Sequence, residues 1–294
     1  MSLVEQAIAR MRNQARAAAP KKLDAVSKPV APPLIVDQVP DLASRPAKRM
    51  TLNMEALRAR GYLPEAARDQ QFADHYRRIK RPLVEKAMSE VAAIGEPRVI
   101  MVTSALPGDG KTFTSINLAL SMALERDISV LLVDCDVAKR HVSDIVGMKE
   151  ESGLLDALVD ESVDVDSLVI QTNLSGLSIL PAGRRVEAAT EHLSSNRMRQ
   201  IIANLCSRNP RRILLLDSPP LLITNEGRTL VKVAGQIVLV IRAGHTPRHA
   251  VQESMGLFDA QQSGGIILNQ VEVGPAEGYY GYGYGSYGNG RDAT

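Results

Sequence analysis

A short glycine-rich segment, Ala105–Thr112, has residue types and spacing that suit the binding of phosphate groups. It reads Ala-Leu-Pro-Gly-Asp-Gly-Lys-Thr, which is the phosphate-binding loop pattern with Ala105 at the first glycine position. Backbone N–H groups of such a loop cradle phosphates, Lys111 can reach the β- and γ-phosphates, and the Thr112 hydroxyl can bind Mg²⁺. The segment predicts a nucleotide site built from Ala105, Pro107, Gly108, Asp109, Gly110, Lys111, Thr112 and Phe113.

Three aspartates stand at the ends of apolar runs that read as strands. Asp134 and Asp136 lie two residues apart at the end of one run, and Asp217 closes a later run beginning at Ile213. Because the carboxyl ends of parallel strands share one rim of the sheet, these carboxylates are expected beside Lys111 and Thr112. Carboxylates in that position can hold Mg²⁺ and orient an attacking hydroxyl.

The C-terminal end of the chain is rich in tyrosine and glycine. Such a segment has little to bury and too much glycine to hold a helix or strand, so a mobile tail is predicted. Mobile tyrosine side chains in a chain with a nucleotide site suggest an enzyme that phosphorylates other copies of itself. The alternative is a low-complexity tail that serves only as an adhesive segment. The candidate phosphoacceptors are five of the seven tyrosines: Tyr279, Tyr280, Tyr282, Tyr284 and Tyr287.

Short apolar runs alternate with helical segments between residues 72 and 269. This alternation predicts an α/β fold in which a mainly parallel sheet is covered by helices on both faces. The predicted helices cover residues 72–93, 113–125, 153–159 and 197–206. The predicted strands are Val99–Thr103, Val130–Asp134, Leu177–Leu180, Ile213–Asp217, Ile237–Ile241 and Ile266–Asn269.

Composition divides the chain into three parts. The first 50 residues hold six of the 16 prolines, which indicates a basic linker (1–70) after a short amphipathic helix at the start. The predicted domain covers residues 71–274, and the tail covers 275–294. A net charge of +2 argues against a nucleic-acid partner, and two lone cysteines fit a reducing cytoplasm. No hydrophobic signal region precedes residue 12, so we expect a soluble protein that reaches a membrane through a partner or a surface helix.

These motifs together resemble the bacterial protein-tyrosine kinases, a P-loop family. The matching segments are Ser104–Thr112, Leu131–Asp136 and Ile213–Pro220, with the tyrosine tail. The chain is most similar to the free-standing autokinases encoded with exosortase-linked exopolysaccharide systems, which share the Asp-Val-Ala stretch at 136–138. The resemblance implies a P-loop fold and phosphorylation of the tail in trans, which would regulate exopolysaccharide polymerisation and export.

The resemblance also assigns roles and partners. It implies that Lys111 and Thr112 bind ATP phosphates and Mg²⁺, that Asp134, Asp136 and Asp217 are the catalytic and metal-handling carboxylates, and that Asn269 lies near the adenine. Asp136 is the candidate acceptor of the tyrosine proton. The implied partners are other copies of the chain, an inner-membrane polysaccharide chain-length protein and a phosphotyrosine phosphatase, which puts the protein in the cytoplasm at the inner membrane.

Two departures from the family pattern stand out. Many members carry arginine shortly after the segment that matches Leu131–Asp136, where this chain has Ala138. The family's Glu-x-x-Arg-x-x-Arg subunit-contact helix is represented only by Asp74, Arg77 and Lys80, which loses bidentate arginine geometry at position 80. Self-assembly is therefore a weaker expectation than nucleotide binding.

Two other functions remain open from the sequence. A positioning ATPase of the related deviant P-loop class usually has a lysine near the start of the loop, where this chain has Leu106. A nucleotide-sensing adapter of an export complex would use the same lysine, threonine and aspartates without transferring phosphate. Transfer from labelled ATP separates the three, because only a kinase labels its own tyrosines.

Overall fold

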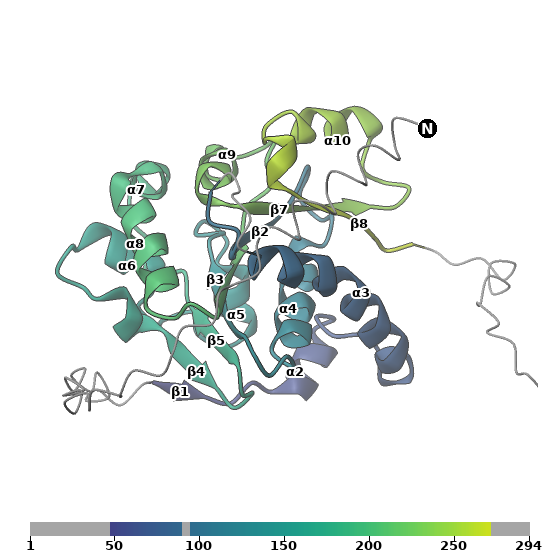
Figure 1. The fold of residues 1–294 in the computed structure, drawn as a ribbon, viewed down its shortest axis with the longest axis horizontal. Helices are drawn as coiled ribbons and strands as arrows, with labels where there is room; N and C mark the ends of the chain where they lie inside the picture. The colour runs from purple at the N-terminus through teal and green to yellow at the C-terminus, as the bar shows by residue number, and fades with distance from the viewer. Residues whose placement is uncertain (1–47, 90–94, 272–294) are drawn as a thin grey trace, which may run out of the picture. The chain divides into compact units, whose positions relative to one another are not determined.

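A twisted eight-stranded sheet forms the centre of the computed structural model, which describes residues 48–89 and 95–271 (Figure 1). Its order is β1-β4-β5-β3-β6-β2-β7-β8, and every pair is parallel except β4–β5. The strands are β1 (Arg49–Met50), β2 (Val99–Ser104), β3 (Ser129–Asp134), β4 (Ile170–Thr172), β5 (Leu177–Leu180), β6 (Arg212–Asp217), β7 (Gln236–Arg242) and β8 (Ser263–Asn269).

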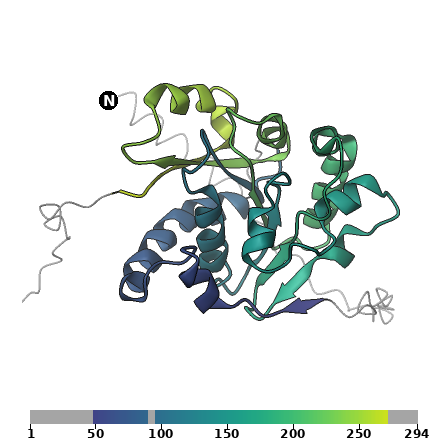
Figure 2. The same cartoon turned by 180° about the vertical axis from the view of Figure 1, so that it is seen from behind.

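Helices cover both faces of this sheet, as the two opposite views show (Figures 1 and 2). The α-helices are α2 (Met54–Ala59), α3 (Asp69–Ala87), α4 (Lys111–Met122), α5 (His141–Ile145), α6 (Leu154–Val159), α7 (Ala189–Ser194), α8 (Asn196–Ser207), α9 (Asn225–Leu230) and α10 (Arg248–Met255). The described residues also form four 3₁₀ turns: η1 (Ala66–Arg68), η2 (Val165–Leu168), η3 (Val231–Val233) and η4 (Ala260–Gln262).

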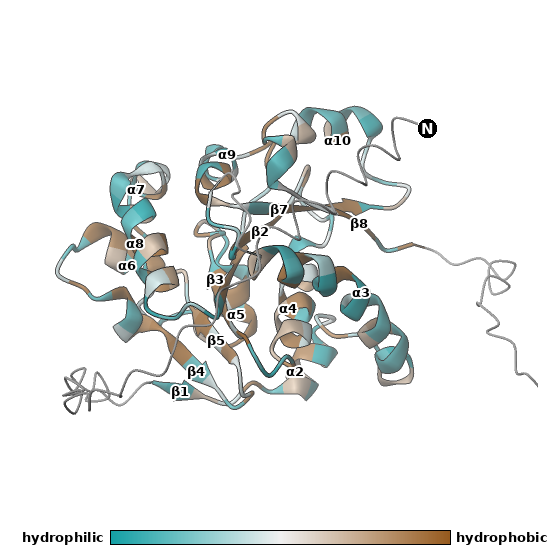
Figure 3. Ribbon diagram, in the orientation of Figure 1, coloured by the Kyte–Doolittle hydropathy of each residue, from teal (hydrophilic) through white to brown (hydrophobic). Residues whose placement is uncertain are grey.

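The central strands are buried on both faces, because successive side chains of a strand point to opposite sides of the sheet. Along β2, Met101 packs with the side chains of α6 and α8, whereas Ile100 and Val102 pack with those of α3 and α4. Figure 3 shows the contrast between the hydrophobic central strands and the mostly hydrophilic helices α3 and α10. The near-continuous apolar runs of the sequence are thus explained by burial on two sides.

The predicted fold class is confirmed, and each of the six predicted strands is present. The helices predicted at 113–125, 153–159 and 197–206 correspond to α4, α6 and α8, whose ends differ from the prediction by at most three residues. The helix predicted at 72–93 begins earlier, at Asp69, and ends earlier, at Ala87, where Met88 caps it. Strands β1 and β4 were not predicted, because runs of two and three residues carry no detectable periodicity.

The predicted start of the domain at residue 71 is wrong. Strand β1 pairs with β4 at the edge of the sheet, and Leu52, Leu57 and Leu63 are buried in the same core as Tyr76. These three leucines are spread among charged residues and proline, so the composition of this stretch predicted a linker rather than part of the core. Residues 1–47 and 272–294, with the predicted N-terminal helix, the tail and its tyrosines, lie outside the described residues.

Within the described part of the chain, no helix combines the length and the apolar character needed to cross a bilayer.

Lys80 does not lie on the surface, although the resemblance places a subunit-contact position there. Its side chain is 8% exposed, and its Nζ lies 2.7 Å from both the Ser121 carbonyl oxygen and Glu125 Oε1. Arg77 pairs with Asp74 on the same helix. Lys80 therefore joins α3 to the end of α4, and this cation is already bound within its own chain.

We expect Lys80→Ala to lower the free energy of unfolding by about 2 kcal/mol, because it removes a buried donor from two acceptors. Arg81→Ala is the matched control, since the Arg81 side chain is 81% exposed and pairs only with the neighbouring Glu85. The control should change stability by less than about 0.5 kcal/mol. Urea unfolding measures both, and equal effects of the two changes would contradict the internal role of Lys80.

Candidate active site

The glycine-rich segment forms a loop between the end of β2 and the start of α4. Gly108 and Gly110 have φ angles of +87° and +97°, in the left-handed region that glycine tolerates. A Cβ on Gly110 would lie 1.9 Å from Asn269 Nδ2, so any other residue would displace the Asn269 side chain as well as strain the backbone. The loop leads directly into the N-terminus of α4, where unpaired N–H groups and the helix dipole favour phosphate.

Asp109 shapes this loop from within. Its buried carboxylate accepts hydrogen bonds from the Leu106 N–H (3.2 Å) and the Thr246 hydroxyl (2.7 Å). The backbone carbonyl oxygen of Asp109 accepts a hydrogen bond from Asn269 Nδ2 (3.0 Å). Both oxygens of the Asp109 carboxylate therefore already accept hydrogen bonds within the protein. The predicted contact of Asp109 with nucleotide would be made by its backbone N–H. Asn269 lies against the loop as well, whereas its contact with adenine stays a prediction.

Lys111 and Asp136 form a buried ion pair at the first turn of α4. Lys111 Nζ lies 2.8 Å from Asp136 Oδ2, and the two side chains are 8% and 2% exposed. Burial alone would lower the pKa of Lys111, but the nearby Asp217 and Asp136 carboxylates outweigh it and the pKa is raised. The lysine therefore stays charged at neutral pH, as phosphate binding requires.

Asp217 accepts hydrogen bonds from two hydroxyls of α4. Thr112 Oγ1 donates to Asp217 Oδ2 (3.0 Å), and Ser115 Oγ donates to Asp217 Oδ1 (2.8 Å). Burial raises the pKa of Asp217, while Lys111 and the two hydroxyls oppose the rise. The strand end and the loop helix are thus tied together at the atoms predicted to bind Mg²⁺.

Asp134 pairs in register with Asp217 on the adjacent strand, and one of its oxygens has no partner. Oδ2 accepts from the Ser143 N–H (2.8 Å) and hydroxyl (2.6 Å), whereas the buried Oδ1 accepts nothing in the described structure. Burial, followed by repulsion from Asp217, raises the pKa of Asp134 to about 7. A buried carboxylate oxygen without a donor is costly, and a bound cation would satisfy it.

These residues fit Mg²⁺. No group of three His, Cys, Asp or Glu side chains in the described residues is arranged to hold a metal. Mg²⁺ needs no such group, because it takes one or two carboxylates and completes its shell with waters and substrate phosphate oxygens. Thr112 Oγ1, Asp217 and the unpartnered Oδ1 of Asp134 would hold the ion, as the sequence predicts.

Comparison with known proteins identifies the family. A family model described as an AAA domain matches residues 97–253, more than half of the chain. The tyrosine-protein kinase YwqD of Bacillus subtilis is 30% identical over 186 residues, which cover 62% of this chain and 77% of YwqD. The chain belongs to the bacterial tyrosine-protein kinases.

Another relative and a solved structure agree with this membership. The tyrosine-protein kinase Wzc of Salmonella typhimurium is 31% identical over 191 residues, 64% of this chain; this chain spans only 26% of Wzc. The crystal structure of the VpsO kinase domain superposes with a TM-score of 0.56 at 28% identity, covering 71% of this chain and all of that domain. This bacterial tyrosine kinase family therefore shares the fold over most of the described residues.

Three hydroxyl residues of this kinase site were missed by the sequence. Ser115 lies one helical turn after Lys111, so its place beside Asp217 could have been read from i, i+4 spacing. Ser143 orients Asp134 and also accepts from the Ala182 N–H (3.0 Å). Thr246 holds Asp109 from a loop 137 residues away. For the last two no local signal exists, because tertiary folding alone brings them to the site.

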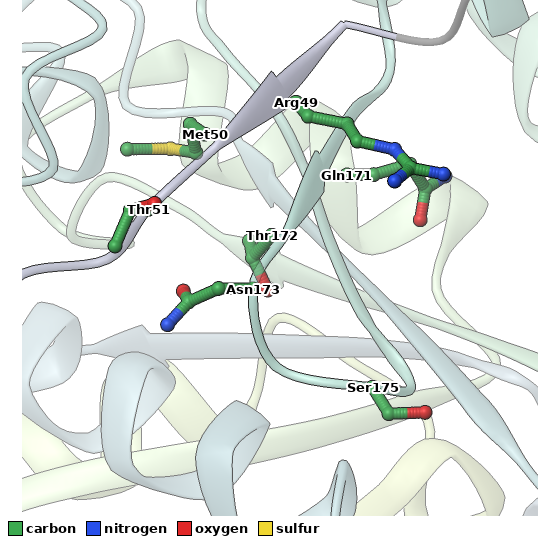
Figure 4. A pocket seen from close by; sticks show the side chains of 7 residues that line it. All are labelled: Arg49, Met50, Thr51, Gln171, Thr172, Asn173 and Ser175. Carbon is green, nitrogen blue, oxygen red and sulfur yellow. The ribbon is translucent and has the colours of Figure 1, made fainter.

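A cavity of about 570 Å³ lies along the paired strands β1 and β4, at the β1 edge of the sheet (Figure 4). Its lining residues are Arg49, Met50, Thr51, Gln171, Thr172, Asn173 and Ser175, none of which belongs to the phosphate-binding loop or to the two segments that carry the three aspartates. The side chains of Arg49 and Gln171 lie side by side at one end of it in the close view.

Proposed function

We propose that the protein is an ATP-dependent protein-tyrosine autokinase that phosphorylates its C-terminal tyrosines in trans. The observation that carries the proposal is the buried Lys111–Asp136 pair at the phosphate-binding loop, on the rim shared with Asp134 and Asp217. A charged lysine for phosphates and a carboxylate for a phenolic proton are the two groups that this transfer needs.

The path of the chain supports the tail as acceptor. Strand β8 runs parallel to β7 and ends at Asn269, whose side chain contacts the loop at Asp109. The chain thus leaves the sheet at the rim that carries the active site. Tyr279 is eight positions after Val271, which allows a reach of about 26 Å when fully extended.

Transfer changes two bonds to the γ-phosphorus. The bond to the oxygen that leaves with ADP breaks with its electron pair, and the phenolic oxygen of tyrosine forms a new one. Asp136 accepts the phenolic proton in this proposal. Asp136 is bonded to Lys111 in the described structure, so Lys111 turning toward ATP phosphates would release the carboxylate and couple nucleotide binding to base activation. A bound Mg²⁺ would supply charge neutralisation for the phosphates.

Phosphorylation offers a way to control assembly. Each phosphate adds about −1.5 to −2 charge, so five would add roughly −7.5 to −10 and reverse the net charge of +2. In our proposal this change disassembles a homo-oligomer and thereby gates exopolysaccharide polymerisation and export. The partners would be an inner-membrane chain-length protein, which holds the kinase at the cytoplasmic side of that membrane, and a phosphotyrosine phosphatase. Equal oligomer mass for the phosphorylated protein and a tail Tyr→Phe variant would contradict this cycle.

Intact mass and phosphopeptide mapping after incubation with Mg-ATP test the activity. We expect several phosphates confined to Tyr279–Tyr287, and none when those five tyrosines are changed to Phe. Hydrolysis of ATP without added mass would favour a positioning ATPase. Nucleotide binding without either reaction, with and without a chain-length partner, would favour an adapter.

A further inference from the structure

A second cavity, of about 280 Å³, lies against the segment that follows the proposed base in the chain. Two of its lining residues, Val137 and Ala138, follow Asp136 in the chain. The rest of the wall comes from α6, from the loop after β5 with the start of α7, and from α9. It is formed by Leu155, Arg185, Val186, Ala189 and Glu226.

The lining of this cavity is apolar with one acidic and one basic group. Val137 and Leu155 are buried, Val186 and Ala189 are half-buried, and Ala138 is exposed at the opening. Glu226 is fixed by the Thr190 hydroxyl, which donates to its Oε1 at 2.7 Å. Apolar walls with few polar groups suit a flat ring that carries a polar tip.

Arg185 stands at the opening of the cavity. Its guanidinium donates a single hydrogen bond, to the Ala138 carbonyl oxygen at 3.2 Å, and the residue is otherwise exposed. Arg140 comes from the same region but is bound to the carbonyl oxygens of Lys149 and Gly183, where it joins two loops. Arg185 is therefore the guanidinium of this pair that can still stack on an aromatic ring.

We propose that this cavity receives the acceptor tyrosine, supplied by the C-terminal tail of a second copy of the chain. The inference rests on the proposed autokinase function and identifies where its substrate binds. A cavity of this size accommodates one aromatic side chain, and the stretch 278–290 offers five phenols without any charged residue. Glu226 admits a neutral phenol and repels the phosphorylated product, which helps its release.

A peptide of sequence 278–290 tests the cavity, with the full chain carrying Phe at all five tail tyrosines as the enzyme. We expect Ala138→Leu, which fills the opening, to raise the KM for the peptide at least fivefold and to leave the KM for ATP within twofold. Arg185→Gln should raise the peptide KM in the same direction by a smaller factor. Ala67→Leu and Arg68→Gln, two exposed positions of η1, are the matched controls and should change neither constant.

Photo-crosslinking gives a readout that does not need catalysis. The same peptide with p-benzoylphenylalanine at position 284 should attach within 137–138 or 185–189, and Ala138→Leu should reduce the yield. Crosslinks elsewhere, or an unchanged peptide KM in Ala138→Leu, would overturn the inference while leaving the kinase function intact. An equal rise in the KM for ATP in Ala138→Leu would assign the cavity to the nucleotide instead. Absence of phosphate on the peptide, and on the tail of the wild-type chain, with ATP consumed, would reject the kinase function, and the crosslinks would still decide the cavity.

Discussion

Lys111→Met should lower the rate of tyrosine phosphorylation by about 10²- to 10³-fold, the size of effect seen when one preorganised charge-stabilising donor is removed from an active site. In the proposed function, the change deletes the cation that binds the ATP phosphates. Lys48→Met is the matched control, because Lys48 is 60% exposed and pairs with Glu151 on the surface. The control should retain at least half of the wild-type rate in a timed transfer assay.

The Lys111→Met change also leaves a buried carboxylate unpaired. Asp136 is 2% exposed, so loss of its partner could cost about 3–5 kcal/mol of folding free energy. The double change Lys111→Met with Asp136→Asn removes this charge and should restore stability without restoring activity. A Lys111→Met protein that keeps more than a tenth of the wild-type rate would refute the phosphate role of Lys111.

Asp134→Asn should make the stability of the protein less dependent on pH while it abolishes phosphoryl transfer. The pKa of Asp134 is raised from 3.8 to about 7 by burial and by Asp217. A carboxyl whose pKa is higher in the folded state stabilises the fold fully below pH 3.8, and this contribution is lost as the pH rises through 7. The full difference corresponds to about 4 kcal/mol.

Urea unfolding at pH 5 and pH 8, without Mg²⁺ or nucleotide, measures this effect. The stability of Asp134→Asn relative to the wild type should increase between the two pH values. Asp127→Asn is the control, because the Asp127 side chain is 91% exposed, and its relative stability should not change. A flat difference for Asp134→Asn as well would show that Asp134 is ionised equally in the folded and unfolded chain. A gain in stability with a loss of activity is typical of a functional site that stores unfavourable charge.

Local sequence signals were sufficient for the central sheet and for the catalytic residue types. The loop at 105–112 and the strands that end at Asp134 and Asp217 were predicted because each is a contiguous pattern: a glycine spacing, or an apolar run closed by a carboxylate. A parallel sheet then requires their ends to share one rim. That rim was confirmed by the register of Asp134 with Asp217.

Contacts between distant segments were beyond the sequence. The start of the domain depended on Leu52, Leu57 and Leu63, which are isolated in the chain and become a core only when packed against α3 and α4. The sequence around Lys80 reads as the exposed side of an amphipathic helix. Lys80 is nevertheless buried, because the end of α4 packs against it and supplies its partners. Local patterns carry no information about such partners.

The same division holds in the active site. The sequence alone identified the loop, Lys111, Thr112 and the three aspartates, because residue type and short spacing are enough to recognise them. Only the tertiary structure decided that Asp136 is held by Lys111, that Asp134 keeps one free oxygen, and that Arg185 reaches the Ala138 carbonyl. These features depend on desolvation and on distances between residues far apart in the chain, and both arise only when the sheet and its helices have packed.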